Sequence, residues 1–167
     1  GATKTAFVHV TDQGSKEMIL PAYNPNRNFD PFKTAVEKSI EIKPNSHIIF
    51  YGAGLSSQQN KNITVDLFKS KELQSIQVFD DILGAARATL GKSEGIVSIL
   101  GTGGLAAHYD GKSITTRRGG YGYLIDDLGG GFELGKRFLT AWLNNDLSEK
   151  VNQVLIERSA TLAFHFF

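Results

Sequence analysis

The hydrophobic and polar positions of the first twenty residues predict a β-hairpin. From Thr5 to Val10 the residues alternate between two faces, Ala6, Val8 and Val10 on one and Phe7 and His9 on the other, which is typical of a strand. A turn at Asp12-Gln13-Gly14 follows, and Glu17–Leu20 supplies the second strand.

The next segment has the spacing of a helix. Asp30 precedes Pro31 as a cap, and the apolar positions Phe32, Ala35, Val36 and Ile40 fall on one helical face.

The remaining pattern predicts, in chain order, a strand at His47–Tyr51, a helix at Asn60–Lys69, a strand at Ser75–Phe79, a helix at Ile82–Leu90, a strand at Ile96–Leu100, a hairpin of Leu105–Tyr109 with Lys112–Thr116, a helix at Phe132–Asn144 and a last helix capped by Ser148. Strands that alternate with helices indicate an α/β fold with parallel pairing and helices packed on the sheet.

Composition narrows the possible functions. The 167 residues suffice for one ordinary domain or two small ones, and a net charge of +1 gives no electrostatic case for nucleic acid or an anionic membrane. The absence of cysteine excludes disulfides, thiolate zinc sites and cysteine-ligated iron–sulfur clusters. The four histidines lie far apart without metal-ligand spacing, and no metal site is predicted.

The ends of the sequence indicate a fragment of a longer protein. The chain begins at Gly1 within an expected strand, and it ends on the apolar run Leu162–Phe167. No apolar run approaches the roughly 20 residues of a membrane helix, and no leader opens the chain, so we expect a cytoplasmic protein.

Two strand ends carry the strongest candidate chemistry. Asp80 and Asp81 follow one strand, where a carboxylate either caps the next helix or accepts a proton from a substrate. The turn Gly101–Gly104 follows the next apolar strand, and its glycines either form a tight turn or let backbone amides approach an anion, with Thr102 adding a hydroxyl. A proton acceptor together with a phosphate loop suggests phosphoryl transfer.

Two other glycine motifs resemble nucleotide-binding loops only in part. Gly130 to Lys136 has the spacing of a P-loop, but Arg137 stands where Ser or Thr is needed, and the segment opens an amphipathic helix. Gly52-Ala53-Gly54 follows a strand but lacks the third glycine of a dinucleotide fingerprint, which favours a tight turn.

Taken together, several motifs resemble the N-acetylglucosamine kinase branch of the sugar-kinase, heat-shock and actin superfamily, the BadF/BadG-type ATPase family. The matching stretches are Gly1-Ala2-Thr3-Lys4-Thr5, Asn24-Pro25-Asn26, Tyr51–Gly54, Asp81–Ala86, Leu100–Gly103, Gly120-Tyr121-Gly122 and Asp127–Gly135. This resemblance covers nearly the whole chain in unbroken order.

The resemblance implies an actin-like fold of two ribonuclease-H-like domains that close over a cleft, with residues 1–93 as the first domain and 94–167 as the incomplete start of the second. It implies ATP and Mg²⁺ as cofactors, an N-acetylated amino sugar as the partner, and Asp81 as the base for the sugar's 6-hydroxyl. By the same resemblance, Thr3, Lys4, Thr5, Gly101, Thr102 and Gly103 would bind phosphate, and Asn24, Pro25, Asp81, Gly120, Tyr121, Gly122 and Asp127 would bind sugar. It also makes a homodimer possible.

The sequence departs from the family pattern at the loops. Leu128 and Gly130 replace a glutamate and a serine, Gly104 replaces a hydroxyl residue, and Tyr121 replaces a tryptophan. Two readings therefore stay open: a kinase for N-acetylglucosamine or a related sugar, and a sugar-binding or regulatory relative without turnover. A third, the dehydratase-activator ATPase, needs cysteine-ligated iron–sulfur chemistry, which zero cysteines disfavour.

Overall fold

The computed structural model describes residues 4–38, 40, 42–122 and 125–162, with the side chains described up to residue 158. The chain forms two compact units. The first comprises the residues up to Val97 together with Ala107–Thr116, and the second comprises Ser98–Ala106 and the residues from Arg117 onward. The prediction that places the domains at 1–93 and 94–167 stays a prediction.

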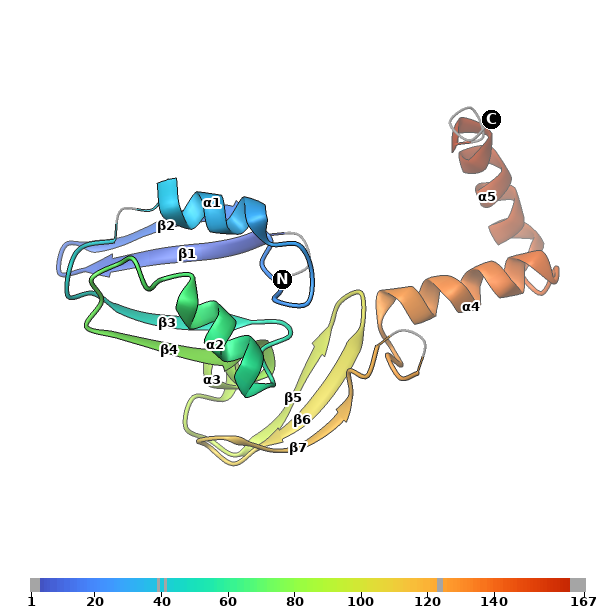
Figure 1. The fold of residues 1–167 in the computed structure, drawn as a ribbon. Coiled ribbons are helices and arrows are strands. Elements are labelled where there is room, and N and C mark those ends of the chain that lie inside the picture. Colours follow the sequence, from blue (N-terminus) through green and yellow to red (C-terminus); the bar gives the residue numbers. More distant parts are fainter. Residues whose placement is uncertain (1–3, 39, 41, 123–124, 163–167) are drawn as a thin grey trace. The chain divides into compact units, whose positions relative to one another are not determined.

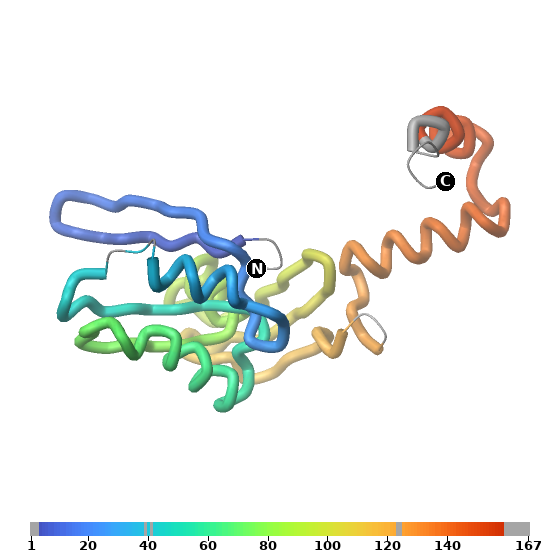
Figure 2. Tube along the Cα trace, turned by 45° about the horizontal axis from the view of Figure 1, so that its top comes forward, coloured from blue at the N-terminus to red at the C-terminus, as the bar shows by residue number. Residues whose placement is uncertain are grey.

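The first unit contains two small sheets (Figures 1 and 2). Strands β1 (Lys4–Thr11) and β2 (Gly14–Pro21) pair antiparallel as the predicted hairpin. Strands β3 (His47–Gly52) and β4 (Ser75–Asp80) pair in parallel, which confirms the parallel pairing expected from the alternation of helices and strands.

Helices cover both faces of the β3–β4 sheet. Helix α1 (Asp30–Lys38) and helix α2 (Gln58–Asp66) enclose the main core, and α3 (Asp81–Leu90) packs on the other face, where Gly84 lies against the Tyr51 ring. The core comprises Leu20, Tyr23, Phe32, Val36, Ile40, Ile48, Phe50, Leu55, Phe68 and Val78. Alternation along β3 explains this division, because Ile48 and Phe50 are buried while Ile49 and Tyr51 between and beyond them are not.

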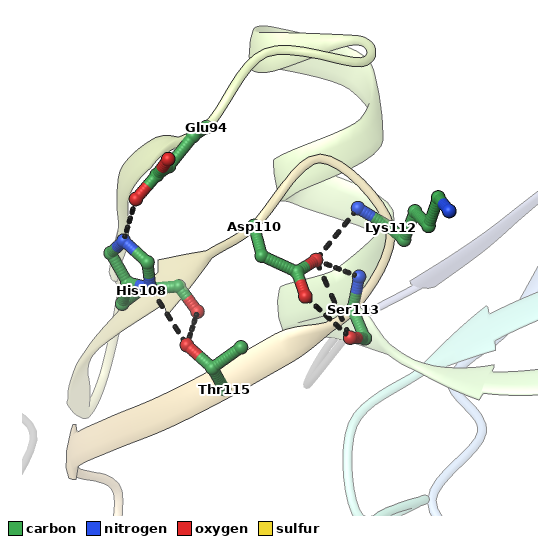
Figure 3. A network of polar contacts seen from close by, with 6 residues as sticks. All are labelled: Glu94, His108, Asp110, Lys112, Ser113 and Thr115. Carbon is green, nitrogen blue, oxygen red and sulfur yellow. Dashed lines mark hydrogen bonds and ion pairs between the residues drawn. The ribbon is translucent and has the colours of Figure 1, made fainter.

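A third sheet orders its strands β5 (Gly95–Leu100), β6 (Gly104–Tyr109) and β7 (Ile114–Gly119). The sequence pattern predicted that the last strand begins at Lys112, but β7 begins two residues later, at Ile114. Figure 3 shows the reason: the Asp110 carboxylate accepts hydrogen bonds from the backbone N–H groups of Lys112 (2.8 Å) and Ser113 (2.7 Å), which holds both residues in the turn.

The second unit continues into two helices, α4 (Gly131–Leu143) and α5 (Glu149–Leu162). Both helices were predicted, and the backbone carbonyl of Ser148 accepts the first bonds of α5 from Val151 and Asn152. None of the α4 side chains is buried among the described residues, so its apolar stripe is exposed at Leu134 and Phe138. In the described part of the chain, no helix combines the length and apolarity that a membrane span requires.

Candidate functional site

The two aspartates at the end of β4 have different environments. Asp80 is 7% exposed and caps α3, since its Oδ1 accepts the Leu83 N–H at 3.3 Å. Asp81 is half-buried, and its Oδ1 accepts the adjacent Ile82 N–H at 2.9 Å. The capping role therefore belongs to Asp80, and Asp81 is the carboxylate that a substrate is better able to reach.

The turn after β3 lies beside these aspartates. Gly52 pairs with Asp80 in the parallel register, so the carboxyl ends of β3 and β4 meet at one edge of the sheet. Gly52-Ala53-Gly54 leaves the sheet there as a tight turn, with φ of 77° at Gly54. In open α/β sheets, ligands bind at this edge.

The Asn24 loop packs against the same turn. A Cβ at Gly54 would lie 2.8 Å from both Asn24 Oδ1 and Asn26 Nδ2, so only glycine permits this approach. Asn60 Nδ2 fixes the contact by donating to Asn26 Oδ1 (3.0 Å) and to the Gly54 carbonyl (2.7 Å). The Asn24 Oδ1 accepts the Asn26 N–H at 2.9 Å, and no bond from its Nδ2 to another described residue is seen.

The residue before Asn24 anchors this loop in the core. Tyr23 is 1% exposed and packs edge-on against Phe50, with ring centroids 5.4 Å apart. Its hydroxyl is 2.8 Å from Thr64 Oγ1, and Thr64 donates to the Asn60 carbonyl at 2.9 Å. Burial raises the pKa of Tyr23, an effect that the Thr64 hydrogen bond partly offsets.

Only part of the first predicted phosphate motif can be placed. Thr3 lies outside the described residues, Lys4 is exposed at the start of β1, and Thr5 is half-buried. The Thr5 Oγ1 is buried and has no hydrogen-bond partner among the described residues. The structure therefore describes Lys4 and Thr5, and their role in binding phosphate stays a prediction.

The second unit brings its predicted residues together at two adjoining loops. Gly101–Gly103 forms the short connection between β5 and β6, and the carbonyls of Gly101 and Thr102 accept bonds from the N–H groups of Gly131 (2.7 Å) and Phe132 (3.0 Å). The start of α4 is therefore bound to this turn, which agrees with a helix start and not a P-loop at Gly130. Asp127 lies so close that a Cβ at Gly103 would be 2.6 Å from its Oδ2.

Two departures from the family pattern have a packing reason. A Cβ at Gly104 would meet the Leu128 carbonyl, and one at Gly130 would lie 2.5 Å from the Gly103 carbonyl carbon. Both glycines are buried, so the two loops touch backbone to backbone where the family pattern has hydroxyl residues.

The last predicted sugar-contact segment forms a small turn of its own. Gly120 donates its N–H to the Asp126 carbonyl (3.1 Å), and Asp126 donates to the Gly122 carbonyl (2.9 Å). The Tyr121 side chain is 72% exposed. These bonds place Gly120–Gly122 beside the residue that precedes Asp127.

The predicted residues thus form one set in each unit. Asn24, Pro25 and Asp81 gather at one sheet edge of the first unit, and Gly101–Gly103, Gly120–Gly122 and Asp127 gather at the loops of the second. The sequence pattern did not identify Asn60 as a residue that positions the Asn24 loop. Its hydrogen bond to Asn26 joins residues 34 positions apart, and no local spacing indicates such a contact. No group of three metal-binding side chains occurs among the described residues.

Comparison with known proteins gives a consistent set of relatives. No protein-family model matches the chain. Over 94 residues, 56% of the chain, the sequence is 31% identical to the N-acetylmuramic acid/N-acetylglucosamine kinase of Clostridium acetobutylicum, and the match spans 31% of that protein.

Two solved structures share the fold. A putative N-acetylglucosamine kinase from Porphyromonas gingivalis matches 96% of the chain with a TM-score of 0.80 and 28% identity. One from Chromobacterium violaceum matches 93% with a TM-score of 0.68 and 20% identity. The chain covers 60% of each of these structures, so the mixed α/β fold corresponds to about one domain of the actin-like fold.

Proposed function

Because the chain is a relative of proteins named as N-acetylglucosamine kinases, we propose that the protein phosphorylates N-acetylglucosamine, or a related N-acetylated amino sugar, at its 6-hydroxyl with ATP. One observation carries this proposal. A half-buried carboxylate, Asp81, lies at the strand edge to which Asn60 and Gly54 also fix the Asn24 loop. A base and an amide at one edge suit a substrate that has both a reacting hydroxyl and an acetamido group.

Asp81 is the proposed base. Its carboxylate accepts the proton of the sugar's 6-hydroxyl as that oxygen bonds to the γ-phosphorus of ATP, and the bond between phosphorus and the ADP oxygen breaks. The products are the sugar 6-phosphate and ADP. Phosphoryl transfer depends mainly on such positioning and on stabilising the charge of the transferring group.

The Asn24 loop is the proposed binder of the sugar. The Nδ2 of Asn24 is a donor for a sugar or acetamido oxygen, because only its Oδ1 is engaged by Asn26. Pro25 stiffens the loop between the two asparagines. Gly120, Tyr121, Gly122 and Asp127 are the contacts proposed from the second unit.

The proposed phosphate contacts are the turn Gly101–Gly103 and the N-terminal residues Thr3, Lys4 and Thr5. Thr102 is exposed and offers a hydroxyl, and the open space at the Cβ position of Gly101 would let a phosphate approach the backbone there. The negative charge of the Asp127 carboxylate beside Gly103 would repel a bare phosphate. A nucleotide whose phosphates carry Mg²⁺ would be repelled less, because the ion offsets their charge.

The described residues fit a magnesium ion that arrives with the nucleotide better than an ion held by a cage of protein side chains. They contain no cluster of three metal ligands, whereas Mg²⁺ commonly binds through substrate phosphates and one or two carboxylates. When bound, the ion would neutralise charge on the transferring phosphate.

The test is ADP release coupled to a colorimetric or fluorescent readout, with ATP, Mg²⁺ and N-acetylglucosamine, on the longest natural form of the protein. Omission of the sugar, and its replacement by glucose, are the controls. The proposal predicts saturable ADP release that depends on the acetamido group. ADP release that is the same with and without sugar would contradict it.

One observation favours a second candidate, a sugar-binding relative without turnover. Gly104 and Gly130 lack the hydroxyls of the family pattern, and their backbones touch the facing loop. This candidate predicts that N-acetylglucosamine binds in calorimetry while no ADP is released, whereas the kinase predicts both.

A further inference from the structure

Helix α3, which begins with the proposed base Asp81, approaches β3 closely at one point. Gly84 lies in the first turn of the helix, and a Cβ there would be 2.9 Å from both Cγ and Cδ1 of the Tyr51 ring. An ordinary contact between carbon atoms is about 3.5–4.0 Å, so a larger residue would push the helix and the ring apart. The position of the first turn of α3 on the sheet therefore depends on where the Tyr51 ring lies.

Burial alone does not hold that ring in place. Tyr51 is 38% exposed, so it lacks the enclosing contacts of a core aromatic residue such as Tyr23. It stacks instead on Phe79 of β4, with ring centroids 5.5 Å apart and ring planes inclined by 27°. Phe79 directly precedes Asp80 and Asp81, so the stacked rings lie at the strand end from which α3 starts.

Arg87 binds both rings from the helix. Its Nη1 donates to the Tyr51 hydroxyl at 2.9 Å, and its guanidinium carbon is 4.5 Å from the centre of the Phe79 ring. The same carbon is 5.9 Å from the centre of the Tyr51 ring. A guanidinium is planar and always charged, so it can donate to a hydroxyl while it lies over an aromatic ring. Arg87 thus connects α3 to β3 through Tyr51 and to β4 through Phe79.

The other end of α3 is held separately. Tyr109 is 2% exposed and belongs to the same compact unit, and its hydroxyl donates to the carbonyl of Gly91, the C-cap of the helix, at 3.1 Å. Without the Arg87 contacts, α3 would still be attached through Gly91 and through its N-cap Asp80. Their loss should therefore shift the helix and not unfold it.

We propose that Arg87 and Tyr51 are positioning residues that hold the first turn of α3, and with it the Asp81 carboxylate, at the sheet edge where the sugar would bind. This inference rests on the proposed function, because that function makes Asp81 the base. Neither Arg87 nor Tyr51 needs to touch the substrate. A displacement of about 1 Å at a reacting group can lower a rate about 10²-fold, so contacts of this kind affect turnover.

The test compares Arg87→Met and Tyr51→Phe with Lys92→Met in the longest natural form. Arg87→Met removes the guanidinium but keeps an apolar stem, and Tyr51→Phe removes only the hydroxyl that accepts its hydrogen bond. Lys92→Met is the control, because it removes one positive charge from an exposed residue just beyond the same helix.

We expect kcat for sugar phosphorylation to fall about 10- to 100-fold in Arg87→Met, by a smaller factor in Tyr51→Phe, and by less than about twofold in Lys92→Met. The Michaelis constant for the sugar should stay within about twofold of the wild-type value, because Asn60 and not Arg87 fixes the Asn24 loop.

Hydrogen exchange at the amides of Ile82 and Leu83 is the second measurement, and it needs neither sugar nor nucleotide. These N–H groups donate to the carboxylates of Asp81 and Asp80, so their exchange reports directly on the first turn of α3. Arg87→Met should lower both protection factors at least threefold, on the order of the change a weakened helix start produces, while the amides of α1 keep their wild-type protection.

Unchanged protection at Ile82 and Leu83 in Arg87→Met would overturn the proposal, whether or not the protein is a kinase. Lowered protection in an active enzyme whose kcat stays unchanged would also overturn it, because the contacts would then stabilise α3 without positioning the base. If the wild type shows no turnover, the proposed function fails, and lowered protection would still support the placement of Asp81 by Arg87 and Tyr51.

Discussion

Single glycines decide how closely the loops of the second unit approach one another. Gly104 and Gly130 are buried where the two loops meet, and a side chain at either would overlap facing backbone. Gly101, in the same turn as Gly103, has open space around its Cβ position. A hydroxyl side chain at Gly104 or Gly130 would therefore require the facing backbone to move.

The substitution Gly104→Ser should destabilise the second unit by about 1–3 kcal/mol, because the new side chain overlaps the Leu128 carbonyl in a packed site. Urea unfolding followed by circular dichroism measures this. Gly101→Ser is the matched control and should change the free energy of unfolding much less. Equal effects of the two substitutions would show that the loops do not meet as described.

A second residue-scale prediction concerns Asn60. Asn60→Ala removes the donor to Asn26 Oδ1 and to the Gly54 carbonyl, so we expect a loss of about 1–3 kcal/mol in stability. In an active longer form, the Michaelis constant for the sugar should rise more than kcat falls, because the loop that holds Asn24 loosens. Asn62→Ala, on the exposed side of α2, is the control, and a similar rise there would argue against a positioning role for Asn60.

At the scale of elements, the candidate site residues of the first unit follow the ends of strands, and neighbouring residues fix their positions. Asp80 ends β4 and caps α3, which leaves Asp81 as the candidate base. The Asn24 loop follows β2 and is tied to the turn after β3 through Asn60. Tyr23 connects that loop to the buried aromatic cluster and to α2.

The Tyr23 environment gives a prediction for alkaline pH. Burial raises the pKa of Tyr23 above its usual value near 10, so the folded state favours the neutral phenol. Its contribution to stability is fully present below about pH 10 and is lost as the pH rises toward the raised pKa of the folded state. The wild type should therefore lose more stability between pH 9 and about pH 11 than Tyr23→Phe does, as measured by urea unfolding.

The exposed Tyr121 provides the control for that experiment. Tyr121→Phe should follow the wild-type pH dependence, because its side chain is 72% exposed. If Tyr23→Phe and Tyr121→Phe both match the wild type, the raised pKa of Tyr23 is contradicted.

A further element-scale prediction concerns the turn between β6 and β7. Hydrogen bonds from the backbone N–H groups of Ser113 and Lys112 lower the pKa of Asp110 below its usual range. The carboxylate's contribution to the turn is present above about pH 4 and is lost as the pH falls through the lowered pKa. The protection factor of the Ser113 amide, measured by NMR against pH, should therefore fall in strong acid. No change in its protection factor across that range would contradict this prediction.

At the scale of the whole molecule, local patterns predicted the elements but not their long-range contacts. The alternation from Thr5 to Val10 and the spacing of Phe32 and Val36 reflect which face is buried, so strand and helix were both recognisable. The contact of Asn60 with Asn26 and the separation of β1 from β3 depend on residues far apart in sequence. No local spacing reports such contacts.

The candidate site shows the same limit. The motifs named the residues, and the structure gathers Asn24 and Asp81 at one sheet edge, and Gly101–Gly103 and Asp127 at adjoining loops. Their roles in binding and catalysis stay predictions, because the chain covers 60% of the matched structures and 31% of the curated relative. The central claim is thus that Asp81, and not its neighbour Asp80, acts on the substrate.

The most direct test compares sugar-dependent ADP release by Asp81→Asn and Asp80→Asn in the longest natural form. Both substitutions remove one charge, and asparagine at position 80 caps a helix about as well as aspartate. The account predicts that Asp81→Asn lowers kcat by about 10²- to 10⁴-fold, the usual contribution of a general base, while Asp80→Asn retains most turnover. Full activity in Asp81→Asn, or an equal loss in both variants with the fold intact, would contradict it.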